Sequence, residues 1–335
     1  MHTPLRYTGE SLKQTQTVAR NGIAQQLHPY IPAPDLVQAV NLAMLLERPL
    51  VLMGEPGCGK SLLAKAVAHE LYGNDLFQHY EEWPVKSTSR ARDGLYEFDQ
   101  VHRLRDATAS SGDVTDMERY IHFGPLGKAF KSSTAHNKRC VLLIDEIDKA
   151  DIDFPNDLLN ELERMEFDIP EMKLDATQAN AGTVRAHFRP VVIITSNSEK
   201  DLPDAFLRRC LFHYIEPLDE GTLREIVSAR YYNEATTTDP LLDDALHMFL
   251  QLRKTIQAEV LSIGKNISTS EFLDWFSALK HFSDQESPGS EAPHVQRMVV
   301  EVEKLKARDM RQVPFHHILF KNIHSVLRFH ENAGR

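Results

Sequence analysis

The sequence predicts an α/β domain built on a parallel β-sheet, followed by a smaller all-α domain. In residues 30–218, short apolar runs rich in β-branched residues alternate with stretches of helical spacing, which is typical of parallel strands covered on both faces. After about Asp219 these runs stop and only helical spacing continues. A glycine-rich segment at 54–61 joins one apolar run directly to a helical stretch. We therefore predict domains at 30–218 and 219–335, preceded by an N-terminal extension at 1–29.

Local patterns predict the elements of the first domain in order. Residues 1–29 are polar and weakly patterned, as expected for an extension or a short helix. The polar stretch at about 86–122 interrupts the strand–helix alternation, so we interpret it as an insertion. Two strand-like pieces within about 165–188 predict a β-hairpin. The remaining strands are expected at 49–53, 76–85, 140–145, 190–195 and 211–215, and the helices at 35–47, 60–72, 125–136 and 154–165.

The second domain is predicted to be entirely helical. Its apolar residues recur at helical spacing, and no alternating run interrupts them. A segment rich in Ser, Pro and Gly at 284–293 indicates a loop. The expected helices span 220–233, 241–257, 270–281, 294–308 and 316–329.

Composition narrows the classes of protein that fit. Over 335 residues the net charge is −10, which argues against a surface for non-specific nucleic-acid binding. No apolar run is long enough to span a membrane, and the N-terminus lacks the apolar stretch of a signal peptide. The three cysteines, Cys58, Cys140 and Cys210, show no metal-binding spacing and fit a reducing compartment. We therefore expect a cytoplasmic protein.

Residues 54–61 read Gly-Glu-Pro-Gly-Cys-Gly-Lys-Ser and follow a predicted strand. In this P-loop pattern the glycines let successive backbone N–H groups point at phosphate oxygens. Lys60 can place its charge between the β- and γ-phosphates, and the Ser61 hydroxyl can bind Mg²⁺. The alternative is a glycine-rich turn that binds no ligand. The predicted nucleotide-binding residues are Gly54, Glu55, Pro56, Gly57, Cys58, Gly59, Lys60, Ser61 and Leu62.

A second motif is the apolar run Val141-Leu-Leu-Ile, which ends in Asp145 and Glu146. An apolar strand that ends in two carboxylates suits the partner position of a P-loop. Asp145 is predicted to hold Mg²⁺, and Glu146 to orient and polarise the attacking water. The alternative is a buried strand followed by a solvated acidic turn.

Two further features carry polar groups that phosphate chemistry can use. Asn197 directly follows the predicted strand at 190–195, where ligands bind in open α/β sheets. Its amide can hydrogen-bond the γ-phosphate or the attacking water. Arg208 and Arg209 precede the last predicted strand, and one of them can act as an arginine finger on another subunit. The alternative is a surface ion pair with Asp204 or Asp219.

The order of these motifs resembles that of AAA+ ATPases, and more narrowly of their MoxR branch, over about residues 30–330. The resemblance implies a hexameric ring that binds ATP and Mg²⁺ between subunits. It implies that the 86–122 insertion and the 165–188 hairpin face a pore or a partner. The stretches that carry it are Tyr30-Ile-Pro-Ala-Pro-Asp-Leu, Gly124-Pro-Leu-Gly-Lys-Ala-Phe, Ile144-Asp-Glu-Ile-Asp-Lys-Ala-Asp and Leu202-Pro-Asp-Ala-Phe-Leu-Arg-Arg-Cys.

The same resemblance assigns roles to individual residues. Asn197 matches the sensor 1 position, and Arg209, with Arg208 as second choice, matches the finger. The family's sensor 2 arginine is missing, because Ser270 stands at its expected place. Lys265 or a neighbouring subunit's side chain could substitute for it.

Three functions fit these features. The first is an ATP-driven, chaperone-like remodeller of a protein partner, for which the resemblance suggests a vWA-domain protein. The second is a nucleic-acid motor, but the mixed charge of the 86–122 insertion does not favour it, and we do not expect a nucleic-acid partner. The third is a scaffold that assembles with ATP without turnover, which the missing sensor 2 arginine leaves open and the intact Glu146 opposes.

Overall fold

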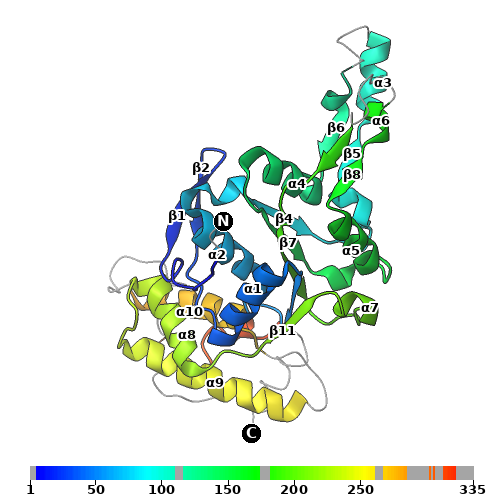
Figure 1. The fold of residues 1–335 in the computed structure, drawn as a ribbon. Coiled ribbons are helices and arrows are strands. Elements are labelled where there is room, and N and C mark those ends of the chain that lie inside the picture. Colours follow the sequence, from blue (N-terminus) through cyan, green and yellow to red (C-terminus); the bar gives the residue numbers. More distant parts are fainter. Residues whose placement is uncertain are drawn as a thin grey trace. The chain divides into compact units, whose positions relative to one another are not determined.

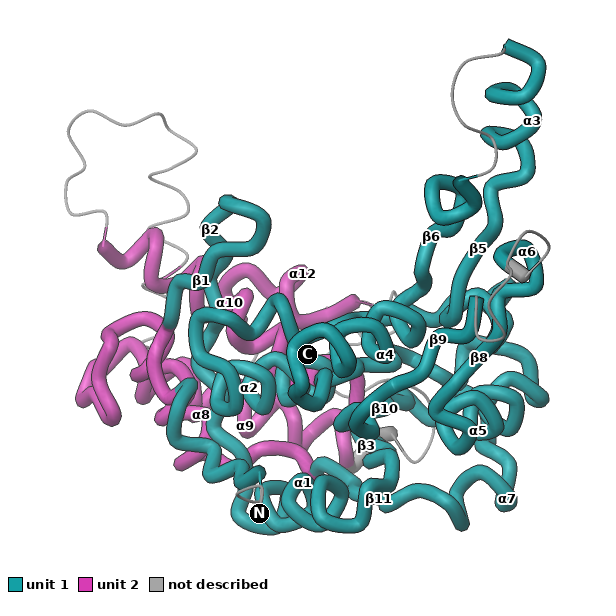
Figure 2. Tube along the Cα trace, turned by 45° about the horizontal axis from the view of Figure 1, so that its top comes forward, with its two compact units in different colours: residues 1–12, 16–54, 60–215 teal, residues 13–15, 55–59, 216–335 magenta. Residues whose placement is uncertain are grey.

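A computed structural model gives the fold and describes residues 5–109, 116–173, 182–260, 267–284, 302, 305 and 312–321. The chain divides into two compact units, which Figure 2 colours separately. Unit 1 comprises residues 1–12, 16–54 and 60–215, and unit 2 comprises residues 13–15, 55–59 and 216–335. The short segment 55–59, within the glycine-rich loop, therefore belongs to the second unit by its contacts.

Unit 1 is built on a five-stranded parallel sheet with the order β11-β3-β10-β7-β4. The central strand β10 is buried at all six positions, as expected for a strand covered on both faces. This confirms the predicted α/β class with a parallel sheet. The strands are β3 (Leu50–Gly54), β4 (Tyr80–Pro84), β7 (Val141–Asp145), β10 (Val191–Ser196) and β11 (Leu211–Ile215).

Helices pack against this sheet (Figure 1). Helix α2 contacts three of the strands, β3, β7 and β10, so the element that follows the glycine-rich loop lies on the middle of the sheet. The predicted strand at 76–85 is shorter than expected, because a 3₁₀ helix, η1 (Gly73–Gln78), precedes β4. The helices are α1 (Pro34–Leu46), α2 (Lys60–Tyr72), α4 (Pro125–His136), α5 (Phe154–Arg164) and α7 (Asp204–Leu207).

Two insertions project from this body of unit 1 (Figure 1). The first pairs β5 (Tyr96–Phe98) with β6 (Ile121–Phe123) and carries α3 (Gln100–Ala109), none of whose side chains is buried. A short helical turn, η2 (Ala91–Gly94), precedes β5, and another, η3 (Met117–Tyr120), leads into β6. The second is the predicted β-hairpin, in which β8 (Glu166–Asp168) pairs with β9 (Thr183–Arg185), and α6 (Pro170–Lys173) follows β8.

The two insertions contact each other through Tyr96. Its ring stacks on Phe167 with centroids 5.9 Å apart, and its hydroxyl donates to a Glu171 carboxylate oxygen at 3.0 Å. These contacts join the β5–β6 hairpin to the β8–β9 hairpin. The sequence indicated both insertions separately but gave no sign of this contact.

The N-terminal extension contains a β-hairpin, not the short helix that we considered. Strands β1 (Gln16–Arg20) and β2 (Ile23–Leu27) pair antiparallel. The turn is Asn21-Gly22, with φ values of 51° and 78°. Two residues with positive φ between the strands form the turn geometry that suits a tight hairpin, and Asn-Gly is its strongest sequence signal. The sequence therefore carried the information that predicts this hairpin.

In the described part of unit 2, the regular elements are helices. Its core includes Trp275, whose indole N–H donates to the Pro314 carbonyl at 2.6 Å. A capping box between Ser268 and Glu271 begins α10. The helices are α8 (Glu220–Val227), the π-helical turn η5 (Ser228–Tyr232), α9 (Pro240–Val260), α10 (Thr269–Ser283) and α12 (His316–Leu319).

The structure tests only part of the predicted second domain. The predicted helices at 220–233, 241–257 and 270–281 are present as α8 with η5, α9 and α10. The loop at 285–293, nearly all of the helix at 294–308 and residues 322–329 lie outside the described residues, as does Lys265. Within the described part of the chain, no helix has the length and apolar character needed to cross a membrane.

Candidate active site

The glycine-rich loop has backbone geometry that only glycine adopts readily. Gly57 and Gly59 have φ values of 76° and 94°. Within unit 2, a Cβ atom at Gly57 would lie 2.8 Å from the Ser268 hydroxyl and 2.9 Å from the Ser270 Cβ. Both the conformation and the close approach therefore require glycine at position 57.

Lys60 and Ser61 begin α2, which starts where the loop ends. Lys60 is only 6% exposed, and its ammonium donates to the Gly54 carbonyl at 2.7 Å. The long side chain thus lies back along the loop, next to its first residue. A positive charge and the N-terminus of a helix occur together at this point, which favours an anionic ligand.

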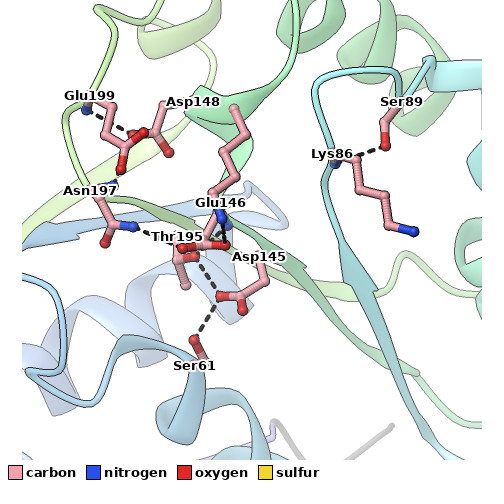
Figure 3. A network of polar contacts seen from close by, with 10 residues as sticks. Ser61, Lys86, Ser89, Asp145, Glu146, Asp148, Thr195, Asn197 and Glu199 are labelled. Atoms are coloured by element: carbon pink, nitrogen blue, oxygen red, sulfur yellow. Dashed lines mark hydrogen bonds and ion pairs between the residues drawn. The ribbon is translucent and has the colours of Figure 1, made fainter. Parts of the chain in front are cut away.

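The Ser61 hydroxyl, in the first turn of α2, meets the Asp145 carboxylate at the end of β7, as Figure 3 shows. The Ser61 hydroxyl donates to Asp145 Oδ1 at 2.6 Å, and the Thr195 hydroxyl donates to the same oxygen at 2.7 Å. Asp145 ends β7 and Thr195 lies in the neighbouring strand β10. Because both strands are parallel, their carboxyl ends bring these groups to one edge of the sheet.

Glu146 lies beside this pair in an uncommon conformation. Its backbone adopts φ 59° and ψ 52°, which non-glycine residues rarely adopt outside turns and functional sites. Its N–H donates to the Thr195 hydroxyl at 2.8 Å. The Asn197 amide donates to Glu146 Oε1 at 3.0 Å, and the Lys149 ammonium forms a close ion pair with Oε2. Both carboxylate oxygens therefore have a donor.

The segment that carries Asn197 is held by a buried aspartate. Asp148 is 2% exposed, and its Oδ2 accepts the backbone N–H groups of Asn197 at 3.1 Å and Glu199 at 2.9 Å. Ser198 between them has φ 59°. In return, the Lys200 ammonium donates to the carbonyls of Lys149 and Ala150, at 3.2 Å and 2.9 Å. The turn after β7 and the turn after β10 therefore fix each other.

Arg208 and Arg209 lie at the other edge of the sheet. They directly precede β11, which starts at Leu211, so they stand at the amino ends of the parallel strands. A five-residue strand spans about 16 Å, which separates them from the carboxyl edge that carries Glu146. Arg209 Nε lies 3.5 Å from a Glu163 carboxylate oxygen, so its ion-pair partner is neither Asp204 nor Asp219.

In unit 2, one buried arginine approaches the loop. Arg253 of α9 is 7% exposed, and its guanidinium lies 3.9 Å from the Glu55 carboxylate and donates to the Leu218 carbonyl at 3.2 Å. Burial lowers the pKa of Arg253, and the negative charge of Glu55 opposes that shift. Ser270 lies in the first turn of α10, near Gly57.

Sequence reasoning missed four residues of this arrangement: Thr195, Asp148, Lys149 and Arg253. Arg253 carried a signal, because it follows Leu246 by seven residues on the buried stripe of α9, where a charge is unusual. Asp148 and Lys149 lie in a stretch already noted for its resemblance to a family. Thr195 carried none, since a threonine in an apolar strand is ordinary.

Comparisons with known proteins give the family. The family model described as "ATPase family associated with various cellular activities (AAA)" matches residues 50–218, which is half of the chain. A search of curated proteins returned no match.

Several solved structures resemble this chain weakly in overall fold. NtrX from Brucella abortus with ADP has 13% identity and a TM-score of 0.42, over 93% of this chain and 70% of that chain. A RuvB mutant from Thermotoga maritima has 13% identity and a TM-score of 0.45, over 83% and 70%. A Cytophaga hutchinsonii ATCC 33406 protein to which ATPase function has been ascribed has 12% identity and a TM-score of 0.36, over 87% and 83%. The assignment rests on the family model: this chain belongs to the AAA family of ATPases.

Proposed function

We propose that this chain binds ATP with Mg²⁺ and hydrolyses it. The observation that carries the proposal is the 2.6 Å contact between the Ser61 hydroxyl and Asp145 Oδ1. A hydroxyl and a carboxylate are oxygen ligands of the kind that Mg²⁺ prefers, and the two fit a shared metal shell. Bound there, the metal would offset the negative charge of the phosphates.

The loop and Lys60 supply the rest of the phosphate site. The backbone of residues 54–59 curls through positive φ angles, and the Lys60 ammonium already lies against the carbonyl of Gly54. Backbone N–H groups, a buried lysine and the start of α2 together favour a polyphosphate. Family membership supports ATP as that ligand.

The carboxyl edge also supports a route for hydrolysis. Glu146 takes a proton from water as the water oxygen attacks the γ-phosphorus. The bond from the γ-phosphorus to the bridging oxygen breaks, and ADP and inorganic phosphate leave. The Asn197 amide, 3.0 Å from Glu146 in this structure, orients the water or a γ-phosphate oxygen. Lys60 meets the charge that develops on the leaving group.

A ring assembly completes the proposal. Arg209 stands at the amino edge of the sheet, so within one chain it lies away from the carboxylates of the site. Its side chain is 49% exposed, which leaves it open to a neighbouring subunit. An arginine finger acts on charge that grows in the transition state. We propose a hexamer in which Arg209 contacts the nucleotide of the next subunit.

The finer proposals rest on the resemblance of the sequence to the MoxR branch. They are a chaperone-like action on a protein partner, a vWA-domain protein as that partner, and a cytoplasmic location. The projecting insertions of unit 1, which contact each other through Tyr96, give such a partner a continuous structure to bind.

The test compares two carboxamide variants. Glu146→Gln keeps the size of the side chain but removes the base, so kcat for ATP should fall about 100-fold or more while ATP binding remains. Glu97→Gln, on the exposed face of β5, is the matched control and should hydrolyse ATP like the wild type. Phosphate release measures turnover, and a fluorescent ATP analogue measures binding.

Three outcomes decide the proposal. Loss of turnover with retained binding in Glu146→Gln supports it. Unchanged turnover in that variant removes the role assigned to Glu146. A wild-type protein that binds no ATP in the presence of Mg²⁺ refutes nucleotide binding itself.

A further inference from the structure

The feature that leads beyond this function is the ion pair of Lys149 with Glu146. Lys149 lies three residues after Glu146, and its ammonium is held on Glu146 Oε2 while Asn197 donates to Oε1. A general base must come within hydrogen-bond distance of the proton that it removes. In this arrangement a water molecule would compete with an ammonium for one oxygen and with an amide for the other.

The backbone around Lys149 is held in place on both sides. The Lys149 N–H donates to the Glu146 carbonyl at 3.0 Å, which closes the turn η4 (Ile147–Lys149). The Lys200 ammonium binds the carbonyl of Lys149 at 3.2 Å. Asp148 anchors the same turn to the segment after β10. The turn therefore presents the lysine side chain to Glu146 without further rearrangement.

The Lys149 side chain itself is free to leave. The side chains of Lys149 and Glu146 are 41% and 36% exposed, unlike the buried Asp148. Exposed ion pairs contribute little to stability, because solvent screens them. A modest competing interaction can therefore separate the pair without unfolding the turn.

The surrounding charge keeps Lys149 in its cationic form. The hydrogen bond to Glu146 is the largest cause of a raised pKa for Lys149, and the charges of Glu146, Glu199 and Asp145 add to it. Near neutral pH Lys149 therefore stays an ammonium.

We propose that Lys149 is a positioning residue that holds Glu146 away from the attacking water, so that turnover requires the ammonium to leave the carboxylate. This inference rests on the proposed ATP hydrolysis. It assigns Lys149 a restraining role, so its removal increases the rate. A lysine that instead contacted a phosphate would have the opposite effect when removed.

The experiment uses three variants of the full chain. Lys149→Met keeps the aliphatic stem and removes the charge, and kcat for ATP should rise about three- to fivefold, a modest gain because the exposed pair is weak. KM for ATP should stay within about twofold of the wild type, because binding does not use the pair. Lys149→Arg keeps a cation and should stay closer to the wild-type rate than Lys149→Met does.

Lys200→Met separates restraint from general loosening. It removes the bonds to the carbonyls of Lys149 and Ala150 but leaves the Lys149–Glu146 pair intact. Its kcat should not exceed that of the wild type. Higher salt screens the pair, so kcat of the wild type should rise toward that of Lys149→Met as NaCl increases.

A measurement without ATP gives a second readout. In Lys149→Met, amide hydrogen exchange in the peptide that contains residues 146–150 should equal that of the wild type, because other hydrogen bonds hold this turn without the ion pair. Faster exchange of that peptide together with a higher kcat would assign the gain to a loosened turn and refute the restraint.

The outcomes distinguish this inference from the proposed function. If the wild type hydrolyses ATP and Lys149→Met is equally fast or slower, the restraint is refuted and the proposed function stands. If the wild type binds ATP without turnover, turnover in Lys149→Met supports the restraint and its absence refutes it. If no variant binds ATP, the proposed function fails and the role of Lys149 fails with it.

Discussion

The two edges of the central sheet in unit 1 differ in chemistry although the same strands form both. At the carboxyl edge, Ser61, Asp145 and Thr195 exchange hydrogen bonds between charged and polar groups. At the amino edge, His79 packs between Tyr72 and His136, with ring centroids 4.5 Å and 5.0 Å away. β7 connects the two edges over five residues.

Ionisation also separates the two edges. Burial lowers the pKa of His79 and raises those of Tyr72, to about 12, and Cys140. All three shifts favour the neutral form, as expected where side chains are desolvated. The comparison teaches that the carboxyl edge links a carboxylate to two hydroxyls, whereas His79, Tyr72 and Cys140 at the amino edge stay neutral and contribute packing. Changes at the carboxyl edge should therefore affect turnover, and changes at the amino edge should affect stability.

Arg209 is the exception that could break this comparison, because it stands at the amino edge and is assigned a catalytic role. If it acts across subunits, Arg209→Ala should reduce kcat about 1,000-fold or more, the range found for arginine fingers. Arg208→Ala, its neighbour in sequence, is the matched control and should change kcat less than about threefold. The rate of each variant is measured against protein concentration. Equal losses in both variants would contradict the assignment to Arg209.

Asp145→Asn tests the carboxyl edge directly. The amide keeps the shape of the side chain but weakens a metal site, so kcat should fall about 100- to 1,000-fold. The melting temperature should change little, because the amide oxygen can still accept from Ser61 and Thr195. Titration of Mg²⁺ against turnover and a thermal melt make the two measurements. A large loss of stability with normal turnover would reverse the roles given to the two edges.

Thr195→Val sharpens the comparison within the carboxyl edge. The change removes the hydroxyl that donates to Asp145 and accepts from the Glu146 N–H. Outer residues that orient metal ligands contribute about 10- to 100-fold, so kcat should fall by about that factor. Thr195→Ser restores the hydroxyl and should recover most of the rate. No recovery would show that packing of the methyl group, not the hydroxyl, decides the effect.

The amino edge predicts a pH dependence of stability through His79. Because its folded-state pKa lies below 6.5, the unfolded chain takes up a proton first as the pH falls. The free energy of unfolding should therefore be highest above pH 6.5 and decrease below it, with a slope of at most about 1.4 kcal/mol per pH unit from this group. Urea unfolding between pH 5 and 8 measures the slope. His79→Phe should flatten it, and an unchanged slope would assign the effect to other groups.

The smallest expected effect is that of Tyr72→Phe. The Tyr72 hydroxyl donates to the Arg139 carbonyl at the amino edge. Loss of this bond should lower the free energy of unfolding by about 1 kcal/mol and leave kcat unchanged. Urea unfolding measures the change in stability, and an ATPase assay on the same preparation measures kcat. A drop in kcat without a loss of stability would contradict the separation of the two edges.

Local patterns predicted most of the architecture of unit 1. The structure has the predicted strands before Glu146 and before Asn197. A strand that is buried on both faces consists of consecutive apolar residues, and such a run is easy to recognise in a sequence. The first insertion was predicted, but its helix α3 was not, since an entirely exposed helix has no apolar stripe to show its period.

The sequence by itself determined the backbone of the loop, since position 57 has a positive φ that glycine adopts readily. It also determined which residues end or directly follow the buried strands: the carboxylates Asp145 and Glu146 and the amide Asn197. Only the tertiary structure decided how they combine. Thr195 reaches Asp145 across about 50 residues of sequence because β10 lies beside β7 in the sheet. The parallel direction of the strands also placed Arg209, which precedes β11, at the opposite edge from Glu146, which follows β7. The spacing of apolar residues along the sequence indicates which side chains are buried, but hydrogen-bond partners depend on which strands become neighbours in the sheet.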